Sequence, residues 1–177
     1  MAARGALVAI NGRGKSPSFI PQTLNDMTEH SHSLSLPEVS FYVLATHDQA
    51  QRQDFACKLI EKIYRSGHFP YVMTDSAEQA EQIDKVLWTF RAGSFIPHQI
   101  YRGEIPAFTS TILIGGENIP DGWQKIVVNL SSLYPPTTAP TERILEILDN
   151  SEECKQAGRQ RYRHYQQADL AITTHKM

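Results

Sequence analysis

Hydrophobic residues recur in alternating strand-like and helix-like patterns from residue 39 onward. The segment 39–45 (VSFYVLA) is almost continuously apolar and rich in β-branched and aromatic residues, which is typical of a strand covered on both faces. A helix is predicted next, with Asp48 as its N-cap and Gly67 at its end, because glycine readily adopts the left-handed cap conformation. Its buried face is formed by apolar residues at helical spacing, namely Ala56, Leu59, Ile60 and Ile63.

The same alternation continues further along the chain. Residues 69–74 (FPYVMT) predict a second strand, and Asp75 or Ser76 can cap the helix that follows. The apolar face of this second helix consists of Ala80, Ile83 and Leu87.

The remaining segments complete an α/β pattern. Residues 89–109 are irregular, whereas 111–114 and 126–130 predict further strands, and the chain is predicted to be helical from Thr141 to about residue 169. Strands that alternate with helices favour a three-layer α/β domain, with a mostly parallel sheet flanked by helices in a Rossmann-like topology and a basic helix at the C-terminus. We predict one such domain over residues 39–177.

Residues 1–38 differ in kind from the rest. They mix Gly, Ser, Pro, Asn and His without a sustained period, which predicts a disordered or mis-assigned N-terminal leader. Gly14, Lys15 and Ser16 resemble the end of a phosphate-binding loop, but the first glycine of that motif is replaced by Ala9 and prolines follow where a helix is required. We therefore reject a phosphate-binding loop here.

Composition narrows the class of protein without indicating a function. The chain has 177 residues, 41% of them hydrophobic, a formal net charge of −2 and two cysteines. A membrane-spanning helix needs about 20 consecutive apolar residues, and the apolar runs here are only a few residues long. Two thiols are too few for a four-thiolate metal site. These features predict a globular cytoplasmic protein with no membrane span and no bound metal or cofactor.

Signals for catalysis are weak. The first strand is followed by ATHDQA and not by a glycine-rich phosphate loop, and the common hydrolase and metalloprotease motifs are missing from the sequence. Cys57 is interpreted as a core residue, and neither Cys154 nor His98 has an adjacent partner for acid–base chemistry. A nucleotide-dependent enzyme stays only as a third hypothesis, and no catalytic residue is predicted.

The C-terminal segment gathers positive charge. From Cys154 onward it contains five basic residues and one acid, for a net charge of +4 in a chain that is −2 overall. Helical spacing places Lys155, Arg159, Tyr162 and Arg163 on one face. A cationic face with an aromatic residue suits either nucleic acid or an acidic peptide that ends in a hydrophobic residue. A merely solvated helix face is the alternative interpretation.

A second segment, residues 87–98 (LWTFRAGSFIPH), concentrates aromatic and apolar residues just beyond a predicted helix. Aromatic residues on a surface loop often anchor a protein partner. Core packing is the equally weighted alternative, because Trp88 lies close to the apolar face of that helix.

These two segments resemble the chi subunit of bacterial DNA polymerase III. The resemblance rests on LWTFRAGSFIPH, on CKQAGRQRYRHYQQADL at 154–170, and on SFYVL and RSG near the first strand and helix. It covers residues 38–177 and implies a non-catalytic accessory subunit of the replisome at the nucleoid. Such a subunit pairs with the psi subunit and links the clamp loader to single-stranded DNA-binding protein by gripping that protein's acidic C-terminal tail.

The resemblance also implies which residues make these contacts. The tail site matches Lys155, Arg159, Tyr162 and Arg163, and the psi surface matches Trp88, Phe95, Ile96 and Pro97. DNA is then reached only indirectly. Direct nucleic-acid binding through the cationic helix remains the alternative function. Gly158 lies within that helix, where glycine is about 1 kcal/mol less favourable than alanine. We expect local packing to offset this cost.

Overall fold

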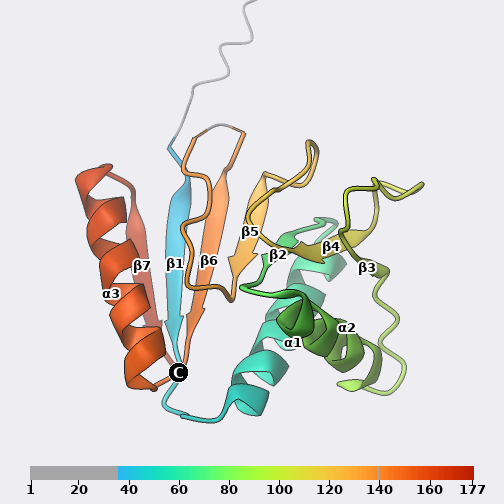
Figure 1. Ribbon diagram of the computed structural model, residues 1–177, viewed down its shortest axis with the longest axis horizontal. Helices are drawn as coiled ribbons and strands as arrows, with labels where there is room; N and C mark the ends of the chain where they lie inside the picture. Colours follow the sequence, from blue (N-terminus) through green and yellow to red (C-terminus); the bar gives the residue numbers. More distant parts are fainter. Residues whose placement is uncertain (1–35, 139) are drawn as a thin grey trace, which may run out of the picture. The chain divides into compact units, whose positions relative to one another are not determined.

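The computed structural model describes residues 36–138 and 140–177, and within them it contains seven strands and three helices. In chain order these are β1 (Glu38–Val43), α1 (Gln49–Arg65), β2 (Tyr71–Met73), α2 (Ala77–Thr89), β3 (His98–Ile100), β4 (Ile112–Gly115), β5 (Ile126–Asn129), β6 (Arg143–Leu148), α3 (Glu152–Gln167) and β7 (Ile172–Lys176). The strands form one parallel sheet in the order β3-β4-β2-β5-β6-β1-β7 (Figure 1). The predicted α/β fold with a parallel sheet is confirmed.

The helices lie on both faces of the sheet (Figure 1). α1 and α2 pack on one face, in a core that includes Ile60, Ile83 and Leu145. α3 packs on the other face over β1, β6 and β7, where Tyr165 contacts a cluster around Phe41 and Ile144. Because successive side chains of a strand point to opposite faces, β6 contributes to both cores. α3 is therefore separated from α1 and α2 by the sheet.

Local signals predicted the first two helices well. Asp48 caps α1, and its carboxylate accepts a hydrogen bond from the Ala50 N–H at 2.8 Å. α1 is followed by Gly67, whose φ of +83° is the left-handed conformation predicted for it. Ser76, one of the two predicted candidates, caps α2 and accepts from the Gln79 N–H at 3.2 Å.

The prediction of one helix from Thr141 to residue 169 is wrong in its first part. Residues Arg143–Leu148 form strand β6, which pairs with β1 and β5, and α3 begins only at Glu152. The spacing of apolar residues in RILEIL fits a helix as well as a strand buried on both faces, and burial on two faces decided the outcome. The short strands β3 and β7 were also not predicted.

Most of the predicted leader, residues 1–35, lies outside the described residues, so the structure does not test that prediction. β1 begins at Glu38, one residue before the predicted strand. None of the helices in residues 36–138 and 140–177 combines the length and apolar character needed to cross a membrane.

Candidate functional site

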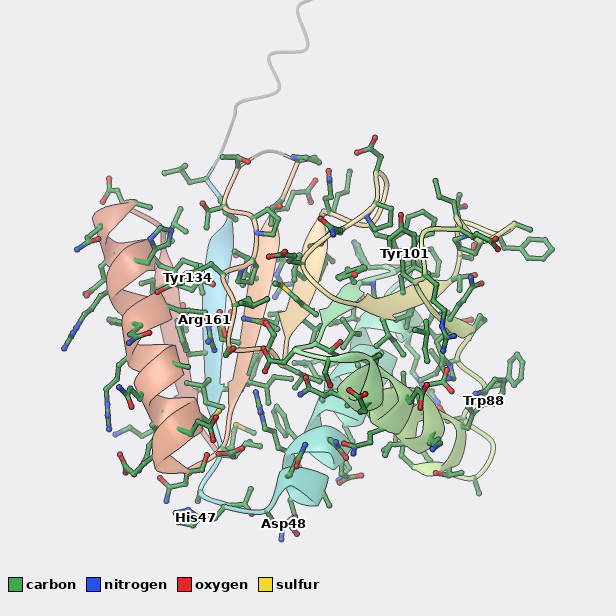
Figure 2. All side chains as sticks on the ribbon, viewed as in Figure 1. His47, Asp48, Trp88, Tyr101, Tyr134 and Arg161 are labelled. Carbon is green, nitrogen blue, oxygen red and sulfur yellow. The ribbon has the colours of Figure 1, made fainter. Side chains whose placement is uncertain are left out.

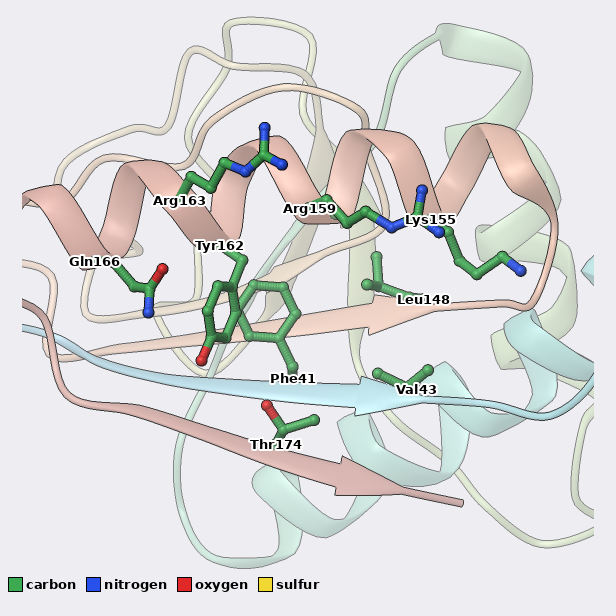
Figure 3. Close-up of a pocket in the computed structure, with 10 residues that line it drawn as sticks. Phe41, Val43, Leu148, Lys155, Arg159, Tyr162, Arg163, Gln166 and Thr174 are labelled. Carbon is green, nitrogen blue, oxygen red and sulfur yellow. The ribbon is translucent and has the colours of Figure 1, made fainter.

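The connection from β6 to β7 places α3 directly over the strand between them. β6 and β7 both pair with β1, so the helix that joins them runs across β1. A pocket of about 460 Å³ opens between α3 and these strands (Figure 3). We call it the α3 pocket, and its lining consists of Phe41, Val43, Leu148, Lys155, Gly158, Arg159, Tyr162, Arg163, Gln166 and Thr174.

The floor of the α3 pocket is apolar. Phe41 and Val43 project from β1, and Leu148 ends β6 beside them (Figure 3). Tyr162 descends from α3 against Phe41, with ring centroids 5.4 Å apart and planes tilted by 56°. Tilted aromatic pairs at this separation are favourable and orient both rings. Phe41 and Leu148 are themselves buried, so the part of the floor that an apolar side chain can cover consists of Val43 and Tyr162, which the Phe41 ring supports from below.

The rim of the α3 pocket is cationic. The structure brings together all four residues that helical spacing placed on one face, because Lys155, Arg159 and Arg163 line the pocket with Tyr162 between them. Lys155 Nζ lies 2.6 Å from Glu152 Oε1, and Arg159 Nη2 lies 3.8 Å from Glu152 Oε2. Within the described part of the chain, Arg163 takes part in no ion pair. The pocket thus combines cations with an apolar floor, which suits an anionic group attached to a hydrophobic one.

Gly158 allows α3 to approach β6 closely. A Cβ atom at this position would collide with Cδ1 of Leu148 and would lie 3.1 Å from its Cδ2. Leu148 is itself buried and lines the α3 pocket. This close packing supplies the explanation that the low helix propensity of Gly158 required.

We expect Gly158→Ala to destabilise the protein. Overpacking a close contact typically costs about 1–3 kcal/mol, which outweighs the roughly 0.5–1 kcal/mol by which alanine is preferred over glycine in a helix. Urea unfolding should show a lower midpoint. Ala157→Gly, at the adjacent half-buried position, measures the cost of glycine in the same helical turn together with the loss of one methyl group. A more stable Gly158→Ala variant would show that Leu148 repacks freely and that the close approach is not required.

Arg161 belongs to the core and not to the cationic rim. Its side chain is 1% exposed and forms a bidentate pair with Glu146, with Nη2 2.8 Å from Oε2 and Nε 2.9 Å from Oε1. Burial disfavours the charge of Arg161, but the charge of Glu146 and its hydrogen bonds outweigh this and raise the pKa of Arg161. Of the five basic residues counted from Cys154 onward, Arg161 therefore adds no positive charge to the surface, because Glu146 neutralises it inside the fold.

The same buried carboxylate gathers further donors that hold α3 to the sheet. The Tyr165 hydroxyl donates to Glu146 Oε1 at 2.6 Å, and Asn129 Nδ2 donates to Glu146 from β5 at 3.1 Å. Burial, and then the charge of Glu146, raise the pKa of Tyr165, so its hydroxyl stays protonated as a donor. Figure 2 shows Arg161 between α3 and the sheet. We call Arg161, Glu146, Tyr165 and Asn129 the buried polar network.

The predicted psi surface divides into exposed and buried parts. Trp88 is 54% exposed and Phe95 is 72% exposed, with ring centroids 5.8 Å apart. Ile96 is 2% exposed and packs in the core beneath α1 and α2, and Pro97 is half-buried. We therefore correct the exposed surface to Trp88 and Phe95, which we call the aromatic surface; Ile96 can only support it from below.

The turn that carries Phe95 is anchored by Glu61 of α1. Glu61 accepts hydrogen bonds from Arg91 Nη1 at 3.1 Å and from Ser94 Oγ at 3.2 Å, and it pairs with Arg65 at 2.7 Å. Burial disfavours the charge of Glu61, but these donors outweigh it and lower the pKa of this carboxyl. The aromatic surface is thus held in place from beneath.

The other candidate residues are accounted for by packing. Cys57 is fully buried in the core, as predicted, and burial raises the pKa of its thiol to about 12. The Nδ1 atom of His98 lies 2.6 Å from the Ile96 carbonyl oxygen, and its Nε2 atom lies 3.2 Å from the Asp84 carbonyl oxygen and 3.5 Å from Asp84 Oδ1. Among residues 36–138 and 140–177, no three metal-ligating side chains come together in a way that could hold a metal ion.

Comparisons with known proteins agree with this arrangement. Residues 36–173 match the family described as DNA polymerase III chi subunit, HolC. The chain is 27% identical over 142 residues to DNA polymerase III subunit chi of Pseudomonas aeruginosa, which covers 80% of this chain and 98% of that protein. The protein of the same name from Haemophilus influenzae is 27% identical over 126 residues, which are 70% of this chain and 85% of that protein. The one from Escherichia coli is 23% identical over 130 residues, which are 69% of this chain and 83% of that protein. The chain therefore belongs to the DNA polymerase III chi subunit family and is a replication accessory subunit.

Proposed function

We propose that this accessory subunit is a non-catalytic adaptor in the DNA polymerase III holoenzyme, at the nucleoid-associated replisome in the cytoplasm. In this proposal the α3 pocket binds the acidic C-terminal tail of single-stranded DNA-binding protein, and the aromatic surface binds the psi subunit. The two contacts link the clamp loader to single-stranded DNA through a protein, so DNA is reached only indirectly.

One observation carries the tail-binding proposal: an apolar floor lies directly beneath a row of cations. The tail expected from the family resemblance ends in a hydrophobic residue with a free carboxylate, preceded by acids. Its hydrophobic side chain would cover Val43 and Tyr162, above the buried ring of Phe41, while Lys155 and Arg159 would donate charge-assisted hydrogen bonds to its carboxylates. Arg163 would receive a further acid along the same helix face.

Direct binding of nucleic acid fits the α3 pocket less well. A phosphate backbone needs a row of cations but has no apolar end group to place on Val43 and Tyr162. Arg161 is neutralised by Glu146, and Lys155 is paired with Glu152, so the cationic face is weaker than the sequence indicates. An acidic peptide that ends in a hydrophobic residue uses both halves of the pocket.

The test is fluorescence anisotropy of a labelled peptide with the C-terminal sequence of single-stranded DNA-binding protein. It is titrated with the wild type and with the Lys155→Ala/Arg159→Ala double variant at two salt concentrations. Binding that the double variant loses supports the adaptor and its site. Direct nucleic-acid binding would be favoured instead if the folded wild-type protein does not bind the peptide but binds bare oligonucleotides with a steep salt dependence.

Arg159→Ala alone is expected to weaken peptide binding by about 1–3 kcal/mol, roughly 5- to 150-fold in Kd, because a charge-assisted hydrogen bond is lost. Arg102→Ala is the matched control, since Arg102 is an exposed arginine in the loop after β3 and does not line the α3 pocket. If the two variants bind the peptide with equal affinity, Arg159 does not belong to the binding site.

A further inference from the structure

The cations of the α3 pocket already hold a carboxylate in the free protein. Glu152, in the first turn of α3, places Oε1 2.6 Å from Lys155 Nζ and Oε2 3.8 Å from Arg159 Nη2. Its side chain is 78% exposed, so this contact lies at the open rim of the pocket. The hydrogen bond from Lys155, followed by the charge of Lys155, lowers the pKa of Glu152 and keeps it ionised.

This pairing is not required by the position of Glu152 in the helix. An acid in the first turn is stabilised by the helix dipole whichever direction its side chain takes. Glu153, the next residue, shares that benefit, yet it forms no ion pair within the described part of the chain and lines a different groove with His47 and Arg52. Glu152 is thus distinguished from its neighbour by its contact with the two pocket cations.

We propose that Glu152 is an internal competitor for the carboxylate position of the α3 pocket. This inference rests on the proposed binding of an acidic tail. A ligand carboxylate that reaches Lys155 and Arg159 must displace Glu152, so the lost ion pairs of Glu152 offset part of the affinity that the ligand carboxylate gains.

The consequence is that the apolar floor contributes a larger share of the net affinity. Because displacement of Glu152 offsets part of the carboxylate's contribution, more of the remaining affinity comes from covering Val43 and Tyr162 with a hydrophobic side chain and from the additional contact with Arg163. Glu152 lowers the affinity of every ligand that must displace it by the same factor. Acidic peptides without a hydrophobic end, and nucleic-acid phosphates, lack the contact with the floor and therefore bind more weakly than the tail.

The test compares Glu152→Gln with Glu153→Gln, two variants that remove one negative charge from the same helical turn. Three labelled probes are titrated at low and high salt: the tail peptide, the same peptide with its terminal hydrophobic residue replaced by serine, and a single-stranded oligothymidylate. Circular dichroism establishes that both variants are folded.

Glu152→Gln is expected to tighten binding of the tail peptide about 2–5-fold at low salt, as for removal of one exposed ion pair, and the gain should shrink at high salt. The serine-ended peptide and the oligothymidylate should gain by a similar factor, because each must displace the same carboxylate. Glu153→Gln should stay within the error of the wild type.

Two failures are distinguishable. If the wild type binds the tail peptide but Glu152→Gln and Glu153→Gln have the same affinity for every probe, Glu152 is not a competitor and only this inference is overturned. If neither the wild type nor Glu152→Gln binds the tail peptide, the proposed function fails, and the competitor role fails with it.

Discussion

Arg161→Ala is expected to lower the free energy of unfolding by about 3–5 kcal/mol, the range seen when one partner of a buried ion pair is removed. Arg161 and Glu146 are 1% and 0% exposed, and three of their nitrogen–oxygen distances are 3.0 Å or less. Removing the guanidinium leaves a carboxylate in the core without a counter-ion.

The remaining donors of the buried polar network do not rescue the charge. Tyr165 and Asn129 are neutral, so they can hydrogen-bond to the carboxylate but cannot neutralise it. Arg161 Nη1 also donates to the Ser132 carbonyl at 3.0 Å, so the loop after β5 loses a contact to α3. Arg161→Ala should therefore weaken the attachment of α3 to the sheet as well as destabilise the core.

Arg159→Ala is the matched control for this measurement. It removes the same kind of side chain two positions away on the same helix. Arg159, however, is 58% exposed, and its Nη2 atom lies as far as 3.8 Å from Glu152 Oε2. Its effect on stability should lie within about 0.5 kcal/mol, as for most surface substitutions. Equilibrium urea unfolding measures both variants. Similar midpoints for Arg161→Ala and Arg159→Ala would contradict the importance of the buried polar network.

These two arginines also show where prediction from sequence stops. Helical spacing placed Lys155, Arg159, Tyr162 and Arg163 on one face, and the structure brings them together in one pocket. Arg161 was left off that face but was counted in the net charge of +4, because charge alone does not reveal burial. A signal was present, since Gly158, Arg161 and Tyr165 recur at the spacing of a buried stripe, and an arginine in such a stripe needs an acid facing it.

That acid could not be recognised while its segment was interpreted as helix. Glu146 stands in the middle of RILEIL, and only as a strand residue does it share a face with Ile144 and Leu148 toward α3. By contrast, the caps at Asp48 and Ser76 depend on neighbouring residues alone, so they were predicted correctly. Local signals were sufficient where the partners are close in sequence, and pairing between distant strands decided the rest.

Trp88→Ala is expected to weaken binding of the psi subunit by about 2–4 kcal/mol, roughly 30- to 900-fold in Kd, the effect of losing a tryptophan at the centre of an interface. Trp88, labelled in Figure 2, is 54% exposed although it is large and apolar. It contacts Phe95, which is 72% exposed. Two exposed aromatic rings in contact form an apolar surface that a partner can cover.

The supports beneath Trp88 make it suited to this role. His98 lies under the indole, with ring centroids 4.8 Å apart, and its own nitrogens are fixed by the Ile96 and Asp84 carbonyls. Glu61 holds the turn that carries Phe95 through Arg91 and Ser94. A surface already held in its binding conformation loses less entropy on association, so more of its contact energy appears as affinity.

Isothermal titration calorimetry with purified psi subunit measures the loss, and Tyr134→Ala is the matched control. Tyr134 is 48% exposed, similar to Trp88, but it packs against His164 of α3 on the other side of the sheet. Trp88→Ala should also leave binding of the acidic tail peptide unchanged, because the sheet separates the aromatic surface from the α3 pocket and distant sites act additively. If Trp88→Ala and Tyr134→Ala bind psi equally well, the aromatic surface is not the psi site. If Trp88→Ala instead weakens binding of the acidic tail peptide, the aromatic surface and the α3 pocket are not independent. That result would contradict an adaptor that binds one partner on each side of the sheet.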